Sequence, residues 1–170
     1  MRKRLFIALI IILMLVPMSI AATEKKQLKF ETTYSFAGGS APNDLQGRLI
    51  IWSGSVSGAF EGEMEWWMHF GDPAWNRPTG ITNHWEDAVW IIYPDDDDPD
   101  SYIMGGEWGS TTMLPETAQK DAVWRANGEV TDASDGYTYL IGRRIHDGGN
   151  VVLGNNFPFT AYGWGEFRIH

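Results

Sequence analysis

The sequence predicts an all-β domain, an antiparallel meander of eight strands closed as a barrel, with a β-sandwich as the alternative. Polar and apolar residues alternate with a period of two along much of the chain after residue 26, which is typical of strands with one buried face. Short stretches rich in Gly, Asn, Asp and Ser separate these segments and favour tight reversals. Glycines also recur inside the expected strands, and a strongly curved sheet needs them for kinks and bulges, which favours a barrel.

The first 22 residues have the pattern of a secretory signal peptide. A basic cluster at residues 2–4 precedes twelve uninterrupted apolar residues from Leu5 to Val16, and small residues follow up to Ala22. An uncleaved membrane anchor is the alternative, in which case this segment would be the chain's contact with a membrane. We therefore expect a secreted or cell-surface protein with a single domain at residues 23–170.

Composition excludes several classes of function. The chain has 170 residues, no cysteine and a net charge of −9. Residues 1–22 hold three basic residues and no acidic ones, so the rest carries 10 basic against 22 acidic residues, a net charge of −12. Nucleic-acid binding is excluded because contact with phosphates needs clustered Lys and Arg. Without cysteine there is no disulfide, no zinc–thiolate site and no cysteine nucleophile, so stability must come from the core or from metal ions.

The first four strands are expected at residues 26–36, 45–52, 57–70 and 87–93. Turn-forming residues at 37–44 and 53–54 separate the first three, and the segment 71–86 is the longest connection. The third strand has the clearest pattern, because its apolar residues share one face and its acidic residues the other. The apolar face holds Phe60, Met64, Trp66, Met68 and Phe70, and the polar face holds Glu61, Glu63, Glu65, Trp67 and His69.

The last four strands are expected at residues 102–108, 121–130, 137–145 and 162–169, with tight turns at 132–136 and 147–150. Trp124 lies on the apolar face of the strand at 121–130, together with two alanines. No window of twelve residues after the signal segment shows helical periodicity with caps, and residues 114–120 form a helical turn at most.

The C-terminal third carries a resemblance to a known class of barrels. It reads VWRANGEVTDA at residues 123–133, GYTYLIGR at 136–143 and GWGEFRI at 163–169. This succession of glycines and aromatic residues resembles the last strands of small eight-stranded barrels of the allene oxide cyclase and dirigent type, in the lipocalin-like class. The resemblance implies a barrel with a central cavity for an apolar molecule. No catalytic residue of that class matches a position in this chain.

An acidic segment at residues 94–100, PDDDDPD, is the sharpest local feature. Asp96, Asp98 and Asp100 have the alternate spacing of calcium loops, and Ca²⁺ takes six to eight oxygen ligands. The glycine and the distal glutamate of an EF-hand are missing, so a solvated acidic loop is the alternative. Calcium is the one cofactor that the sequence suggests.

Our preferred hypothesis is a non-catalytic barrel that binds a small apolar or aromatic ligand in its interior, because small-molecule sites are concave and mostly apolar. The expected lining residues are Phe60, Met64, Trp66, Met68 and Trp124.

Two other functions stay open. A cell-surface carbohydrate-binding module would use Trp67, Trp75 and Trp85, whose rings could stack on sugars. An enzyme of the cyclase or isomerase kind would need an ionisable group inside the barrel, and its catalytic residues are unknown. The face with Glu61, Glu63 and Glu65 has a spacing that suits paired carboxylate chemistry, but any solvated strand presents such a face.

Overall fold

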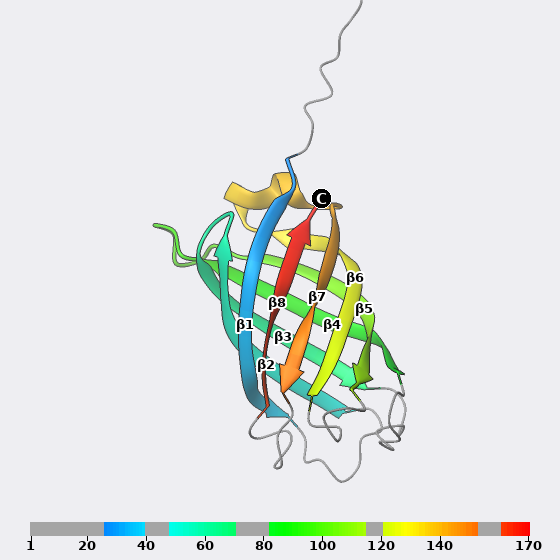
Figure 1. Ribbon diagram of the computed structural model, residues 1–170. Coiled ribbons are helices and arrows are strands. Elements are labelled where there is room, and N and C mark those ends of the chain that lie inside the picture. The colour runs from blue at the N-terminus through cyan, green and yellow to red at the C-terminus, as the bar shows by residue number, and fades with distance from the viewer. Residues whose placement is uncertain (1–25, 40–47, 71–81, 115–120, 153–160) are drawn as a thin grey trace, which may run out of the picture.

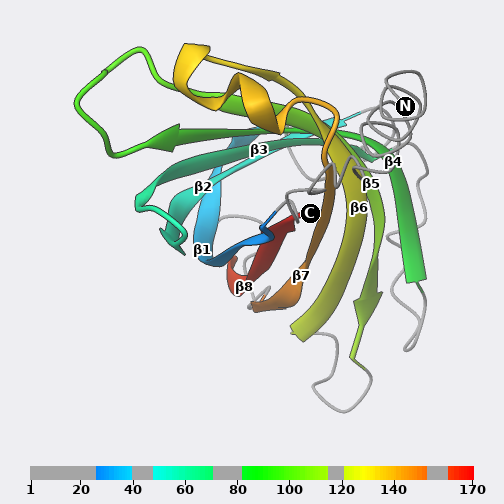
Figure 2. The same cartoon turned by 90° about the horizontal axis from the view of Figure 1, so that it is seen from above.

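The computed structural model describes residues 26–39, 48–70, 82–114, 121–152 and 161–170. Its eight strands run antiparallel in sequence order, and the last pairs with the first, so the predicted closed meander barrel is confirmed (Figures 1 and 2). The strands are β1 (Leu28–Gly39), β2 (Arg48–Gly58), β3 (Gly62–Phe70), β4 (Thr82–Pro94), β5 (Ile103–Met113), β6 (Asp121–Ala133), β7 (Arg144–Val152) and β8 (Tyr162–Ile169). The 3₁₀ helix η2 (Asp135–Leu140) lies between β6 and β7.

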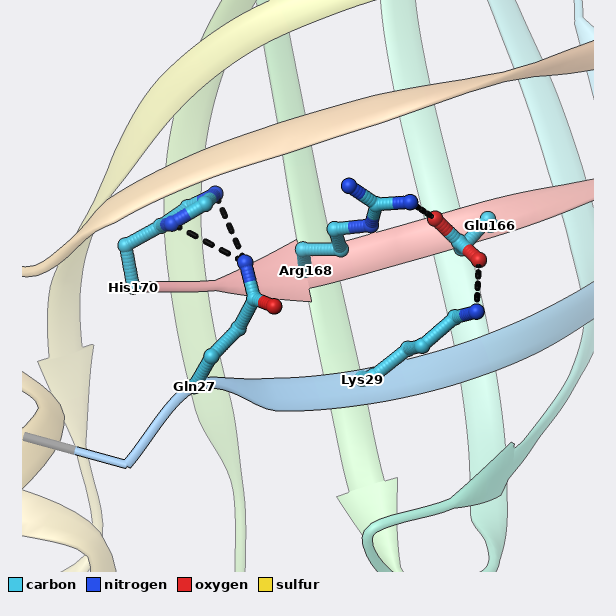
Figure 3. Close-up of polar contacts among 5 residues, drawn as sticks. All are labelled: Gln27, Lys29, Glu166, Arg168 and His170. Atoms are coloured by element: carbon cyan, nitrogen blue, oxygen red, sulfur yellow. Dashed lines mark hydrogen bonds and ion pairs between the residues drawn. The ribbon is translucent and has the colours of Figure 1, made fainter.

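The seam between β1 and β8 closes the barrel. The two strands pair from Leu28 opposite Ile169 to Ser35 opposite Tyr162. On the outer wall, Glu166 forms ion pairs with Lys29 across the seam and with Arg168 on its own strand, as Figure 3 shows. The Gln27 side chain contacts the ring of His170 at the end of the same seam. Closure leaves neither strand with a free hydrogen-bonding edge, which is the feature that otherwise invites aggregation.

Large aromatic side chains pack inside the barrel over glycines of neighbouring strands, which leave room for the rings. Trp90 of β4 lies over Gly105 of β5, where an added Cβ would be 2.3 Å from the indole ring. In the same way Gly163 of β8 lies under the ring of Tyr34 of β1. The in-strand glycines that the sequence analysis assigned to curvature therefore also provide space for rings.

Two sequence predictions are wrong around β7. Residues 137–145 were expected to form a strand, but η2 occupies Asp135–Leu140 and β7 begins only at Arg144. The expected turn at residues 147–150 lies inside β7, opposite β6 and β8. The glycines there serve packing, since an added Cβ at Gly149 would be 2.2 Å from the ring of Trp124. Similarly, the expected turn at residues 53–54 lies inside β2, opposite Tyr34–Ser35 and Met64–Glu65.

The helix η2 packs at one end of the barrel, the end where the C-terminus also lies (Figure 1). Leu140 is fully buried, and the ring of Tyr137 contacts that of Phe60, which contacts Phe30 in turn. At this end the buried guanidinium of Arg143 donates hydrogen bonds to the backbone carbonyls of Lys26 and His170. These contacts link η2 and both ends of the described chain to the core.

The predicted signal segment, residues 1–22, lies outside the described residues. Within the ranges that are described, no helix has the length and apolar character needed to cross a membrane.

Candidate functional site

The five residues predicted to bind a ligand all belong to the interior. Met64, Trp66 and Trp124 are buried in the hydrophobic core, and Phe60 and Met68 are partly buried against it. They come from β3, from the turn before it and from β6. The structure therefore places this set of residues on the inner side of the barrel, where the alternation of β3 and β6 predicted them.

Tyr34 of β1 lies at the centre of the aromatic side chains. Its ring makes edge-to-face contacts with the indoles of Trp52, Trp66 and Trp124, with centroid distances of 5.4, 5.1 and 5.0 Å. Edge-to-face geometry is a favoured arrangement of aromatic rings and adds to the gain from burial. These rings join β1, β2, β3 and β6 into one aromatic wall.

Two carboxyl groups face the same interior from β5 and β7. Glu107 is 4% exposed and Asp147 is 6% exposed. The strand β6 lies between them, with Gly128 opposite Glu107 and Ala126 opposite Asp147. Because both intervening residues are small, β6 places no bulky side chain at these two positions. We call Glu107 and Asp147 the carboxyl pair.

The carboxyl pair has few partners. The indole Nε1 of Trp124 donates a 3.0 Å hydrogen bond to Oδ2 of Asp147. Among the described residues, none donates a hydrogen bond to Oδ1 of Asp147 or to Oε2 of Glu107, and no Lys or Arg of the described ranges forms an ion pair with either group. Buried carboxylates are normally paired with a cation or neutralised by protonation.

Burial controls the protonation of this site. It raises the pKa of Glu107 well above the usual range, and the nearby charge of Asp147 raises it further. Burial also raises the pKa of Asp147 to about 7, although hydrogen bonds from Trp124 and from the backbone N–H of Gly148 act in the opposite direction. The pKa of the Tyr34 hydroxyl is raised by burial and then by the charges of Asp147 and Glu107. Burial therefore favours the protonated form of Glu107, and Asp147 is partly ionised at neutral pH.

Three further polar atoms on the inner side lack a hydrogen-bond partner within the described chain. They are Nε1 of Trp66, Nε1 of Trp90 and Oγ1 of Thr32. Trp66 and Trp90 are directly opposite each other on β3 and β4. By contrast, the buried indole of Trp85 has a partner, since its Nε1 donates to Oγ1 of Thr111 at 3.4 Å.

Glu107, Asp147 and Tyr34 are not among the site residues predicted from the sequence. A signal was present in the alternation, because Glu107 is in phase with the buried Ile103 and Thr111, just as Asp147 is in phase with Ile145 and Val151. An acidic residue in phase with an apolar face indicates a buried carboxyl group. Glycines between these residues hid the pattern, and in β7 they were interpreted as a turn.

The tryptophans proposed for carbohydrate binding do not form one set. Trp85 was expected in a long exposed loop, but it lies in β4 and is 1% exposed. Trp67 lies on the outer wall, where its Nε1 donates to the carboxylate of Glu65. Trp75 is outside the described residues. The acidic residues expected on one face of the third strand point outward as well, since Glu61, just before β3, and Glu63 in β3 are exposed.

The acidic segment forms a turn between β4 and β5 that uses its own carboxylates. The backbone N–H of Asp98 donates to Oδ1 of Asp96, and that of Asp100 donates to Oδ1 of Asp98, both at 3.0 Å. The hydroxyl of Tyr137 donates to Oδ2 of Asp96 at 2.9 Å. No cluster of three or more His, Asp or Glu side chains placed to hold a metal ion occurs in the part of the chain that the structure describes. Calcium binding at Asp96, Asp98 and Asp100 stays a prediction.

No family model matches the sequence, and no curated protein matches it with statistical support. Among solved structures, the crystal structure of a protein with unknown function from Clostridium acetobutylicum is similar, with a TM-score of 0.51 and 18% sequence identity. The match covers 85% of this chain and 99% of that chain. Such a likeness indicates a shared fold alone. The resemblance to allene oxide cyclase and dirigent barrels stays a prediction.

Proposed function

We propose that this barrel binds a small molecule with an aromatic or apolar body in its interior, and that the carboxyl pair contacts a polar group of that molecule. The observation that carries the proposal is the set of buried polar atoms without partners among the described residues. They lie on the inner side of β1, β3, β4, β5 and β7, and one of them belongs to Trp66, whose ring contacts Tyr34.

Leaving buried polar atoms without hydrogen-bond partners lowers the stability of the folded protein. A buried donor or acceptor without a partner costs about 1–3 kcal/mol, and native proteins keep few of them. The described residues place five of them in the interior of this barrel. A ligand with polar groups on an apolar body would supply partners for them, and a few well-placed polar groups in an apolar lining are what small-molecule sites contain.

Two variants of neighbouring residues on β6 test where binding occurs. Ala126 is buried on the inner side between the carboxyl groups, and Asn127 is exposed on the outer side. Ala126→Leu fills the interior, whereas Asn127→Leu adds the same side chain to the surface. The probe is N-phenyl-1-naphthylamine, a neutral apolar dye whose fluorescence rises in apolar sites, and the melting temperature of each variant checks folding.

We expect one dye molecule to bind per wild-type or Asn127→Leu chain, and Ala126→Leu to weaken binding at least about tenfold. If Ala126→Leu does not fold, the smaller Ala126→Val takes its place with the same expected direction. Equal binding by the inner and outer variants would contradict an interior site. Failure of the wild-type protein to bind the dye would contradict the proposal itself.

An enzyme of the cyclase or isomerase kind is the second candidate, and the carboxyl pair is the observation that favours it. A general acid or base works best when its pKa lies near the operating pH, and the pKa of Asp147 is about 7. In that case Asp147 would move a proton, with protonated Glu107 as a hydrogen-bond donor. Recovery of the natural ligand unchanged after incubation with the protein would support binding, and its conversion by wild type but not by Asp147→Asn would support catalysis.

We further propose that the protein is exported, as residues 1–22 suggest. Mass spectrometry of the protein recovered from outside the cytoplasm of an expressing cell tests this. The expected chain begins at Thr23, and a chain that retains Met1 would indicate an anchor.

A further inference from the structure

Resting on the proposed function, we infer that the ligand is a small aromatic amine whose ammonium group binds between Glu107 and Asp147. Three features of the site favour such a ligand: its charge, its free hydrogen-bond acceptors and its aromatic surroundings.

The carboxyl pair has no basic side chain as a counter-ion among the described residues. Buried carboxylates usually pair with Arg or Lys, but no basic side chain of the described residues pairs with Glu107 or Asp147. The buried guanidinium of Arg143 is engaged with two backbone carbonyls at the end of the barrel. A positively charged group of a ligand would therefore supply the counter-ion that the described residues do not. A negatively charged group would be repelled by the carboxylates of Glu107 and Asp147.

Each carboxyl group of the pair has one oxygen that accepts no hydrogen bond from the described residues. A primary ammonium group has three donors and no acceptor, so it can donate to both Oε2 of Glu107 and Oδ1 of Asp147. Bonds of this kind are charge-assisted and about twice as strong as neutral ones. The residues of β6 opposite the pair are Ala126 and Gly128, so this strand places no bulky side chain of its own at the two positions facing the carboxyl groups.

The aromatic surroundings fit the rest of such a ligand. Trp124 bonds directly to Asp147, and Tyr34 contacts Trp124 and Trp66. Aromatic rings stabilise a nearby ammonium group through their electron-rich faces and also pack against a ligand ring. The indole N–H groups of Trp66 and Trp90 can only donate, so they suit an acceptor atom of the ligand such as a hydroxyl oxygen.

Binding of an ammonium group also depends on pH. The titratable groups of the described residues that face this interior are Glu107 on β5, Asp147 on β7 and Tyr34 on β1. The described inward side chains of β2, β3, β4, β6 and β8 are apolar or glycine, and Arg143 is held at the barrel end. A cation favours the ionised carboxylates, so binding displaces protons from the pair and strengthens as the pH rises from 6 to 8. A primary amine stays protonated over this range, because its pKa is about 10.

Calorimetric titration with three probes of similar shape tests the inference. The probes are phenethylamine, 2-phenylethanol and 3-phenylpropanoate, which carry a positive, a neutral and a negative end group. At pH 8 we expect the amine to bind at least about tenfold more tightly than the alcohol, and the carboxylate to bind most weakly. The advantage of the amine over the alcohol shrinks at pH 6, and the amine releases protons on binding.

Two double variants locate the effect. In Glu107→Gln/Asp147→Asn, we expect the amine to lose its advantage over the alcohol. Glu63→Gln/Glu129→Gln removes two exposed carboxylates from the outer wall and should keep that advantage. If the first double variant does not fold, the single variant Asp147→Asn is expected to reduce the advantage.

The outcomes separate this inference from the proposed function. If the alcohol or the carboxylate binds as tightly as the amine, the inference is wrong and interior binding stands. An equal preference for the amine in wild type and in Glu107→Gln/Asp147→Asn would also overturn the inference. If neither the three probes nor the naphthylamine dye binds, the proposed function fails as well.

Discussion

Trp124 donates a 3.0 Å hydrogen bond from its indole Nε1 to Oδ2 of Asp147, and this bond joins the aromatic wall to the carboxyl pair. The two residues lie on neighbouring strands, with Trp124 opposite Gly149 and Asp147 opposite Ala126. Because Oδ2 is engaged in this way, Oδ1 is the atom of Asp147 that stays available. The bond therefore helps to orient the buried carboxyl group of Asp147.

The indole proton of Trp124 should report the charge of Asp147. Ionisation of the acceptor strengthens the bond, so we expect the Nε1 proton resonance to move downfield with a midpoint near pH 7, where Asp147 titrates. NMR of protein labelled with ¹⁵N in its tryptophans measures this, and Trp124→Phe assigns the signal. Asp147→Asn should abolish the shift, and persistence of the shift in that variant would show that another group causes it.

The carboxyl pair should make the protein less stable as the pH rises. A carboxyl whose pKa is higher in the folded than in the unfolded chain binds more protons when folded, so its ionisation favours unfolding. For Asp147 this window runs from about pH 4 to about pH 7, and Glu107, whose pKa is also raised, acts in the same direction. Each group lowers the free energy of unfolding by about 1.4 kcal/mol per pH unit inside its window.

Urea unfolding of wild type and Glu107→Gln/Asp147→Asn between pH 5 and 8 measures this effect. We expect the wild type to lose stability relative to the double variant as the pH rises. His170 has a lowered pKa from partial burial and nearby positive charges, which acts in the opposite direction near pH 6, but it is present in both proteins and cancels in their difference. If the difference in unfolding free energy between the two proteins does not change with pH, Glu107 and Asp147 do not have the raised pKa values expected of buried carboxyl groups without a cationic partner among the described residues.

The space that glycines leave for tryptophan rings predicts unequal effects at two adjacent residues. An added Cβ at Gly105 would lie 2.2 Å from the carbonyl oxygen of Glu129 and 2.3 Å from the ring of Trp90. At Gly106 the nearest atom would be the carbonyl oxygen of Ala88, 3.9 Å away. We expect Gly105→Ala to lower the free energy of unfolding by at least about 2 kcal/mol, and Gly106→Ala to change it by about 0.5 kcal/mol or less. Equal unfolding midpoints for the two variants would show that the packing of the Trp90 ring does not depend on the missing side chain at Gly105.

The sequence was sufficient to predict the barrel because the alternation in β1, β3 and β6 is regular. Each of these strands has apolar residues on one face, and the structure buries that face. The inward placement of Met64, Trp66 and Trp124 followed from the same pattern.

The carboxyl pair could not be predicted in the same way, because it depends on contacts between strands. Gly148 and Gly149 have the composition of a turn, and only the register shows that Gly149 accommodates the ring of Trp124. Judged from the sequence without that register, Asp147 has the pattern of a turn residue and Glu107 that of a solvent-exposed strand residue. Their opposition across Ala126 and Gly128 follows from the pairing of β5, β6 and β7.

The central claim is that two carboxyl groups without a cationic partner among the described residues lie inside the barrel, and their direct titration tests it most closely. NMR of protein labelled with ¹³C in the side-chain carboxyls of Asp and Glu follows each group between pH 3 and 9, with Glu107→Gln and Asp147→Asn to assign the two signals. We predict that Asp147 titrates near pH 7 and Glu107 well above the usual range of a glutamate. Titration of both groups near pH 4, as for exposed carboxyls, would contradict the account.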